Sequence, residues 1–191
     1  KDAANLYLKN GMLALRNAFK PELVESLNNE FFFKYQKYFE NKDHEDALKT
    51  GNKRFMVTVE LAGPFNDTGF YAHDKIIPLI QYLLGRKAIL NSVGAVIALP
   101  NAKLQHLHQD GTIFDPYDNP NFVRHVPLLP PFAITLVIPL VPLDHINGTT
   151  RIFPGTHLFP SSLATSLDVD TLPACEPHTL LGDCYLMDYR V

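Results

Sequence analysis

The chain has 191 residues, of which 46% are hydrophobic, and its 17 basic and 20 acidic side chains do not gather into runs. This length suits one packed domain, and the near-neutral charge argues against nucleic acid or an anionic membrane surface as partner, so we expect a small molecule. No apolar stretch approaches the roughly 20 residues that span a bilayer, and two cysteines make no secreted disulfide framework, so a cytoplasmic location is expected.

The first part of the chain, about residues 1–86, is expected to be largely helical. Helices are predicted at 2–9, 21–39 and 74–85, and strands at 12–19 and 54–62. Asn10-Gly11 and Gly85 are typical helix ends, and Pro21 is typical of a first helical turn. Apolar residues recur every four positions after Pro21, which indicates that the second helix packs one face against a core.

The second part, about residues 87–191, changes to short β-rich runs between turn residues. Strands are predicted at 88–99, 104–109, 132–141, 149–153 and 184–189. The chain is therefore expected to be a single domain, 1–191, mainly β with packed helices, built as a jelly roll or β-sandwich. Residues 115–131 form one long irregular stretch, which predicts a lid over a partly hydrophobic substrate.

Three polar side chains interrupt the apolar segment "LQHLHQDGTIF" at alternate positions, His106, His108 and Asp110. Alternate residues of a strand point to the same face, so these side chains would project together. His108-x-Asp110 could then supply two ligands of a two-histidine, one-carboxylate site, which leaves open positions on Fe(II). His106 fits a third ligand by spacing, although a place beside the site is the more ordinary interpretation.

Four segments in order resemble landmarks of the phytanoyl-CoA dioxygenase family. They are "GMLALRNAFKPELVESL", His108-Gln109-Asp110, "NGTTRIFPGTH" and "LLGDCYLMDYRV", and together they extend over essentially the whole chain. Members of this family are Fe(II)- and 2-oxoglutarate-dependent oxygenases with a double-stranded β-helix (jelly-roll, cupin-like) core. The resemblance therefore implies an enzyme that uses molecular oxygen to oxidise, by hydroxylation in the simplest case, a C–H bond of a small organic substrate.

The resemblance also implies roles for particular residues. His108 and Asp110 correspond to iron ligands, and Gln105 and Thr150 are similar to side chains that contact 2-oxoglutarate. In the family, the segment that resembles Asp188-Tyr189-Arg190 is followed by the second histidine ligand and then by an arginine that binds 2-oxoglutarate. We therefore expect the third ligand, that arginine and the last part of the jelly roll beyond Val191.

Other interpretations stay open. One is a catalytically silent jelly-roll binding module, and another is a cupin-like metal enzyme that uses His106, His108 and a further histidine without 2-oxoglutarate. Arg151 or Arg190 could replace the missing arginine, although Arg190 is better explained as an ion-pair partner of Asp183 or Asp188. For His157, a contact near the site and a structural hydrogen bond are equally good interpretations. Cys175, His178 and Cys184 do not match a usual zinc spacing.

Overall fold

The computed structural model describes residues 1–40, 42, 44–111, 129–159 and 168–191. The α-helices are α1 (Asp2–Asn10), α2 (Pro21–Tyr35), α3 (Thr68–Tyr71) and α4 (Ile77–Leu84). The strands are β1 (Met12–Leu15), β2 (Leu48–Gly51), β3 (Arg54–Thr58), β4 (Gly94–Ala98), β5 (Ile134–Val137) and β6 (Cys184–Asp188). Of the lid expected at 115–131, residues 115–128 lie outside the described residues.

The helices expected from the sequence are confirmed, because their start and end signals act as predicted. Gly11 follows α1 in the left-handed conformation and its N–H donates to the Tyr7 carbonyl at 2.7 Å. Pro21 occupies the first turn of α2, and Gly85 ends α4 with a positive φ of 88°. The described residues are a mixture of helix and antiparallel sheet, so the expectation of a mainly β chain needs correction.

Two expected strands do not form within the described residues. Residues 104–109 have no regular secondary structure, and the segment 149–153 contributes one isolated bridge, between Ile152 and Cys175. Alternating side chains make a strand only where the backbone finds a partner. After residues 104–109, the backbone reaches the end of β6 at Gly111, whose N–H donates to the Tyr189 carbonyl at 2.9 Å.

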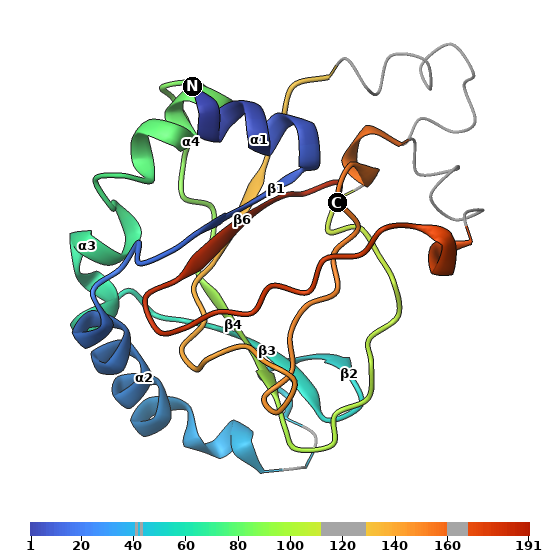
Figure 1. Cartoon of the computed structure of the whole chain (residues 1–191). Helices are drawn as coiled ribbons and strands as arrows, with labels where there is room; N and C mark the ends of the chain where they lie inside the picture. Colours follow the sequence, from blue (N-terminus) through green and yellow to red (C-terminus); the bar gives the residue numbers. More distant parts are fainter. Residues whose placement is uncertain (41, 43, 112–128, 160–167) are drawn as a thin grey trace.

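Sheet A is antiparallel in the order β1-β6-β5, so strands far apart in the sequence lie side by side. Met12 pairs with Met187 on one side of β6, and Thr135 pairs with the same residue on the other side. Helices α1 and α4 cover one face of this sheet (Figure 1). On that face Tyr7 packs near Leu186. The opposite face carries Met12, Tyr185 and Met187, together with Thr135 on β5.

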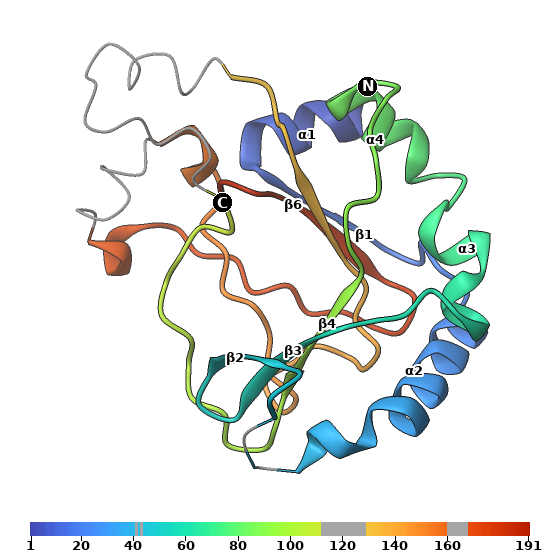
Figure 2. The same cartoon turned by 180° about the vertical axis from the view of Figure 1, so that it is seen from behind.

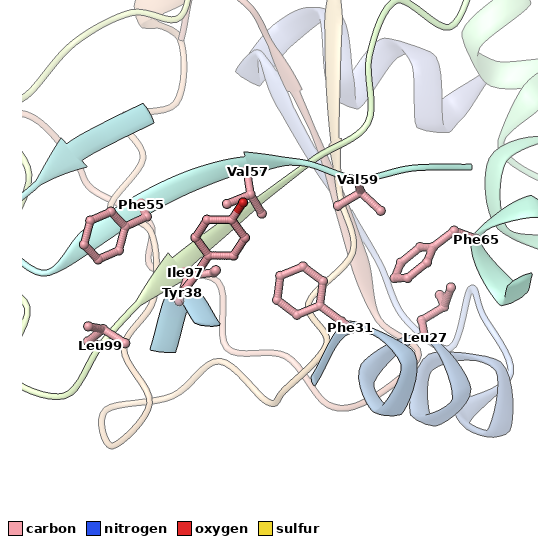
Figure 3. Close-up of a cluster of buried hydrophobic side chains, with 9 residues drawn as sticks. All are labelled: Leu27, Phe31, Tyr38, Phe55, Val57, Val59, Phe65, Ile97 and Leu99. Atoms are coloured by element: carbon pink, nitrogen blue, oxygen red, sulfur yellow. The ribbon is translucent and has the colours of Figure 1, made fainter. Parts of the chain in front are cut away.

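Sheet B, in the order β2-β3-β4, packs one face against α2. Alternate residues of β3 are buried, Phe55 and Val57, while Met56 between them is 39% exposed. Figure 3 shows Phe55 and Val57 directed toward the side that carries Phe31 of α2. Seen from behind in Figure 2, α2 runs along the outside of β3 and β4, so the buried side chains join helix and sheet into one core.

A buried carboxylate fixes the connection between β1 and β6. Asp183 accepts hydrogen bonds from the N–H groups of Asn17 and Leu180, at 2.8 and 2.9 Å, and from the Arg16 guanidinium at 2.6 Å. Burial alone would raise the pKa of Asp183, but these hydrogen bonds outweigh that effect and hold its pKa below its ordinary value. No helix among the described residues is long and apolar enough to cross a membrane.

Candidate metal centre

His108 and Asp110 lie side by side, as their spacing predicts. The Nε2 atom of His108 is 3.6 Å from Oδ1 of Asp110, and the two side chains are 42% and 40% exposed. Two ligands bound at about 2.1 Å in adjacent octahedral positions would stand roughly 3.0 Å apart. The observed separation is therefore within a small side-chain rotation of the distance that a shared metal ion requires.

The other polar atom of each side chain is hydrogen-bonded within the protein, which leaves Nε2 of His108 and Oδ1 of Asp110 available to bind a metal ion. The Nδ1–H of His108 donates to the backbone carbonyl of His106 at 2.9 Å, which places the imidazole lone pair on Nε2. The hydroxyl of Thr135 donates to Oδ2 of Asp110 at 3.4 Å, whereas the oxygen that pairs with His108 is Oδ1. The donor set of one imidazole nitrogen and one carboxylate oxygen therefore fits a divalent metal such as Fe(II).

The glycine that follows the pair is required by packing. An added Cβ on Gly111 would lie 2.8 Å from Cε1 of Tyr189, and still closer to Cδ1 of the same ring. Gly111 is buried, and its N–H bonds to the Tyr189 carbonyl. This close approach brings the segment that carries His108 and Asp110 against the residues that follow β6, beside the point marked C in Figure 1.

His106 does not complete a three-ligand site. Its ring centroid is 5.3 Å from that of His108, and its side chain is exposed. In the part of the chain that the structure describes, no three His, Cys, Asp or Glu side chains gather closely enough to hold a metal ion. The described residues therefore offer neither the trio expected for the cupin-like alternative nor a zinc site at Cys175, His178 and Cys184.

Thr150, expected to contact 2-oxoglutarate, lies over the same sheet face as Asp110. Its hydroxyl is 3.1 Å from the phenol oxygen of Tyr185, which pairs with Val137 of β5. Thr135, which binds Asp110, is two residues before Val137 and so points to the same face about 7 Å away along the strand. Gln105 is half-buried and lies in the irregular segment before His108.

Comparison with known proteins identifies the family. The family model "Phytanoyl-CoA dioxygenase" matches residues 7–171, which is most of the chain. The chain belongs to this family. The description of this family model names a dioxygenase, which is the enzyme class predicted from the sequence. Two of the solved structures that the chain resembles hold the predicted co-substrate 2-oxoglutarate (alpha ketoglutarate), one with Fe3+ and the other with nickel.

The chain is also similar to a curated dioxygenase over part of its length, and it shares its fold with several solved structures. The multifunctional dioxygenase prhA of Penicillium brasilianum is 30% identical over 100 residues, which are 48% of this chain and 30% of that protein. The epimerase SnoN from nogalamycin biosynthesis, described as non-heme and alpha ketoglutarate dependent, aligns with a TM-score of 0.67 at 17% identity over 99% of this chain and 71% of its own. HygX of Streptomyces hygroscopicus, solved with nickel and 2-oxoglutarate, aligns with a TM-score of 0.61 at 12% identity over 100% and 78% of the two chains. At such identities, the structural similarity shows a shared fold.

The two arginines considered as 2-oxoglutarate anchors have other partners. Arg190 is buried and binds the Asp188 carboxylate through two of its nitrogens, Nε to Oδ1 at 2.8 Å and Nη2 to Oδ2 at 2.9 Å. Of the two ion-pair partners expected for Arg190, the structure therefore selects Asp188. Arg151 is 45% exposed and lies 3.8 Å from Glu176. Because its fork is already paired within the protein, Arg190 does not serve as a carboxylate anchor.

His157 has a structural role. It is 2% exposed, and its Nε2–H donates to the carbonyl of Leu8 in α1 at 3.0 Å. Burial lowers the pKa of His157, so the ring is neutral at pH 7. Between the two roles that the sequence left open, the structure favours the hydrogen bond that holds α1 in place.

Sequence reasoning missed two side chains at the site, Thr135 and Gln109. Thr135 is the polar residue within the apolar strand "ITLV", and a single polar side chain on such a strand could have indicated a functional contact. Gln109 lies between the two ligands, and its amide donates to the carbonyl of Arg190 at 2.6 Å. Since the partner of Gln109 is 81 residues away, no local pattern could have revealed this contact.

Proposed function

We propose that the protein is an Fe(II)- and 2-oxoglutarate-dependent dioxygenase that oxidises a C–H bond of a small, partly hydrophobic organic substrate. Nε2 of His108 and Oδ1 of Asp110 are the two proposed iron ligands within this sequence. The observation that carries the proposal is the free, facing pair of donor atoms at 3.6 Å, in a chain of the phytanoyl-CoA dioxygenase family. When bound, iron and 2-oxoglutarate supply the oxidation of the substrate by molecular oxygen.

The protein's own residues orient this chemistry. The carbonyl of His106 keeps the proton on Nδ1 of His108, so Nε2 remains a ligand without rotation of the ring. The Thr135 hydroxyl holds Oδ2 of Asp110, so Asp110 would hold the metal through Oδ1. We further propose that Gln105 and Thr150 contact 2-oxoglutarate, with Thr150 oriented by the phenol of Tyr185.

The proposal also covers the third ligand, the core of the domain and the cellular compartment. The third ligand is proposed to be a histidine beyond Val191, and the core is proposed to be a double-stranded β-helix within one domain, 1–191. Pairing of β1 with β6 and of β3 with β4 supports one domain, because each pair joins residues from both sides of position 86.

Cys175 and Cys184 are unpaired, which favours a reducing compartment such as the cytoplasm.

Names of similar proteins guide the choice of substrate class. SnoN was solved with nogalamycin RO, and SnoK from the same biosynthesis, described as a carbocyclase, aligns with a TM-score of 0.66 at 18% identity. The compound and the reaction are those of SnoN and SnoK themselves. For this chain they support a small organic molecule, rather than nucleic acid, as the substrate, with the specificity residues proposed at 115–131.

The test is anaerobic titration of the native-length protein with Fe(II) and 2-oxoglutarate, followed by the weak visible charge-transfer band of the chelate. The parent should give the band and His108→Ala should lose it. His106→Ala is the matched control, since the backbone carbonyl that His106 supplies is kept, and it should retain the band. Absence of the band from the parent would refute the proposal and favour the silent binding module, whereas metal binding lost in His106→Ala would favour the cupin-like alternative.

A further inference from the structure

We propose that Gln109 and the buried ion pair of Asp188 and Arg190 are positioning residues for the metal ligands. This inference rests on the proposed function and adds to it residues that do not touch the metal. Their atoms hold the segment from His108 to Gly111 against the residues that follow β6, named here the β6 turn (residues 188–191).

Two hydrogen bonds attach this segment to the β6 turn on both sides of Asp110. The side-chain amide of Gln109 donates to the carbonyl of Arg190 at 2.6 Å, and the N–H of Gly111 donates to the carbonyl of Tyr189 at 2.9 Å. The acceptors are consecutive carbonyls of one turn. Hydrogen bonds of Gln109 and Gly111 therefore hold Asp110 from both sides, although its own side chain is 40% exposed.

The ion pair fixes the turn that supplies these carbonyls. Asp188 and Arg190 are 3% and 7% exposed, and their side chains make a two-point contact while the Arg190 N–H also donates to Oδ1 of Asp188 at 3.0 Å. Arg190 further donates to the Leu129 carbonyl at 3.3 Å. The pair therefore closes the turn locally, because the two residues are only two positions apart.

Asp188 also attaches the turn to the middle of sheet A. It is the last residue of the central strand β6, and its N–H donates to the carbonyl of Gly11 at 2.8 Å. The path from the sheet to the ligand thus consists of β6, the Asp188–Arg190 pair, the two carbonyls and Asp110. A shift of the turn would be transmitted to Asp110 directly, since its neighbours on both sides are bound to the turn.

Positioning of this kind has a measurable consequence. Loss of a group that orients a metal ligand typically weakens metal binding by about 10–100-fold, because the ligand must then be ordered when the metal binds. A purely structural role of Gln109 predicts a change in stability with metal affinity unaltered. Metal affinity and stability measured on the same variant therefore separate the two roles.

The experiment compares Gln109→Leu with the parent in the native-length protein, using Mn(II) alone as probe. Leucine keeps the approximate volume of glutamine but cannot donate to the Arg190 carbonyl. The dissociation constant, measured by electron paramagnetic resonance of free Mn(II), should rise by about tenfold or more. The amide of Gly111 should exchange its hydrogen faster in the variant, which reports the loosened segment in the absence of any metal.

Gln81→Leu is the matched control, because it makes the same chemical change at an exposed position of α4. It should bind Mn(II) as the parent does. Arg190→Lys keeps the charge without the two-point fork and should give a smaller rise in the dissociation constant than Gln109→Leu. This second variant tests the pair without leaving a buried carboxylate unpaired, and an Arg190→Lys protein that binds Mn(II) as tightly as the parent would overturn the role proposed for the pair.

The outcomes distinguish the inference from the function on which it rests. Gln109→Leu that binds Mn(II) as tightly as the parent would overturn the inference, whether or not its melting temperature changes. Equal loss of affinity in Gln109→Leu and Gln81→Leu would overturn it as well. A parent that fails to bind Mn(II) would refute the proposed metal site itself, and the positioning role with it.

Discussion

Gly111→Ala should damage the fold and the metal centre together. The added methyl would lie 2.8 Å from Cε1 of Tyr189 and still closer to Cδ1, whereas carbon atoms in contact are normally at least about 3.5 Å apart, so the ring must move by more than about 0.7 Å. Phe132 lies edge-on to the Tyr189 ring at 6.3 Å between centroids and limits that movement. Overpacking of a buried site typically costs about 1–3 kcal/mol.

Urea unfolding of parent and variant, with the Fe(II) and 2-oxoglutarate titration alongside, checks this expectation. Tyr189→Ala provides the matching partner of a double-mutant cycle, because it removes the ring that the new methyl meets. In the Tyr189→Ala background, Gly111→Ala should cost less by about 0.5–3 kcal/mol. The control is Gly51→Ala, since a Cβ there meets its nearest neighbour, Cβ of Arg54, at an ordinary 3.8 Å.

Two results would refute the reasoning. One is a Gly111→Ala protein whose unfolding free energy and chelate band both equal those of the parent. The other is additivity of Gly111→Ala and Tyr189→Ala, which would show that the methyl and the ring do not meet.

Three further expectations concern buried groups. Burial lowers the pKa of His157 from 6.5, so the folded protein should lose stability as the pH falls from 6.5 through the folded-state pKa. The free energy of unfolding should decrease by up to about 1.4 kcal/mol per pH unit over this range. His157→Gln should remove this slope when unfolding by urea is measured at a series of pH values. The pKa of Asp183 is below 3.8, so the stabilisation by its carboxylate is present above pH 3.8 and lost in stronger acid. Asp183→Asn should lower the free energy of unfolding by about 1–3 kcal/mol at pH 7 and make it depend less on pH in acid. An unchanged pH dependence in acid would exclude this role of Asp183. Burial raises the pKa of the Cys184 thiol to about 12, so a thiol reagent at pH 7.5 should label Cys175 first and Cys184 only after unfolding, as mass spectrometry of the labelled peptides can show.

The helices were predictable because their signals are local. Pro21 and Gly85 mark the start of α2 and the end of α4 within one turn, and apolar spacing defines the buried face. Sheet pairing was not predictable in this way. Met12 finds Met187 across the length of the chain, and no pattern near either residue specifies the other.

The proximity of His108 and Asp110 was predicted correctly, but the argument from alternation was incomplete. A regular strand would have directed the His106 ring to the same face as His108 and Asp110. The segment is irregular instead, and the backbone carbonyl of His106, not its ring, acts on His108. His106 thus contributes to the orientation of the site through a group that every residue has, which side-chain chemistry in the sequence could not indicate.

The central place of β6 in sheet A determines when the sheet can assemble during synthesis. Neither β1 nor β5 has its partner until residues 184–188 have been translated, since both pair with β6. At about 5–20 residues per second, roughly 9–35 s pass between Leu15 and Asp188. During this interval the apolar residues of β1 remain open to chaperones and to aggregation, and the segment of Asp110 remains without the turn that holds it. The segment that carries His108 and Asp110 is therefore among the last parts of the molecule to be fixed in place, because the turn that holds it is translated after nearly all of these residues.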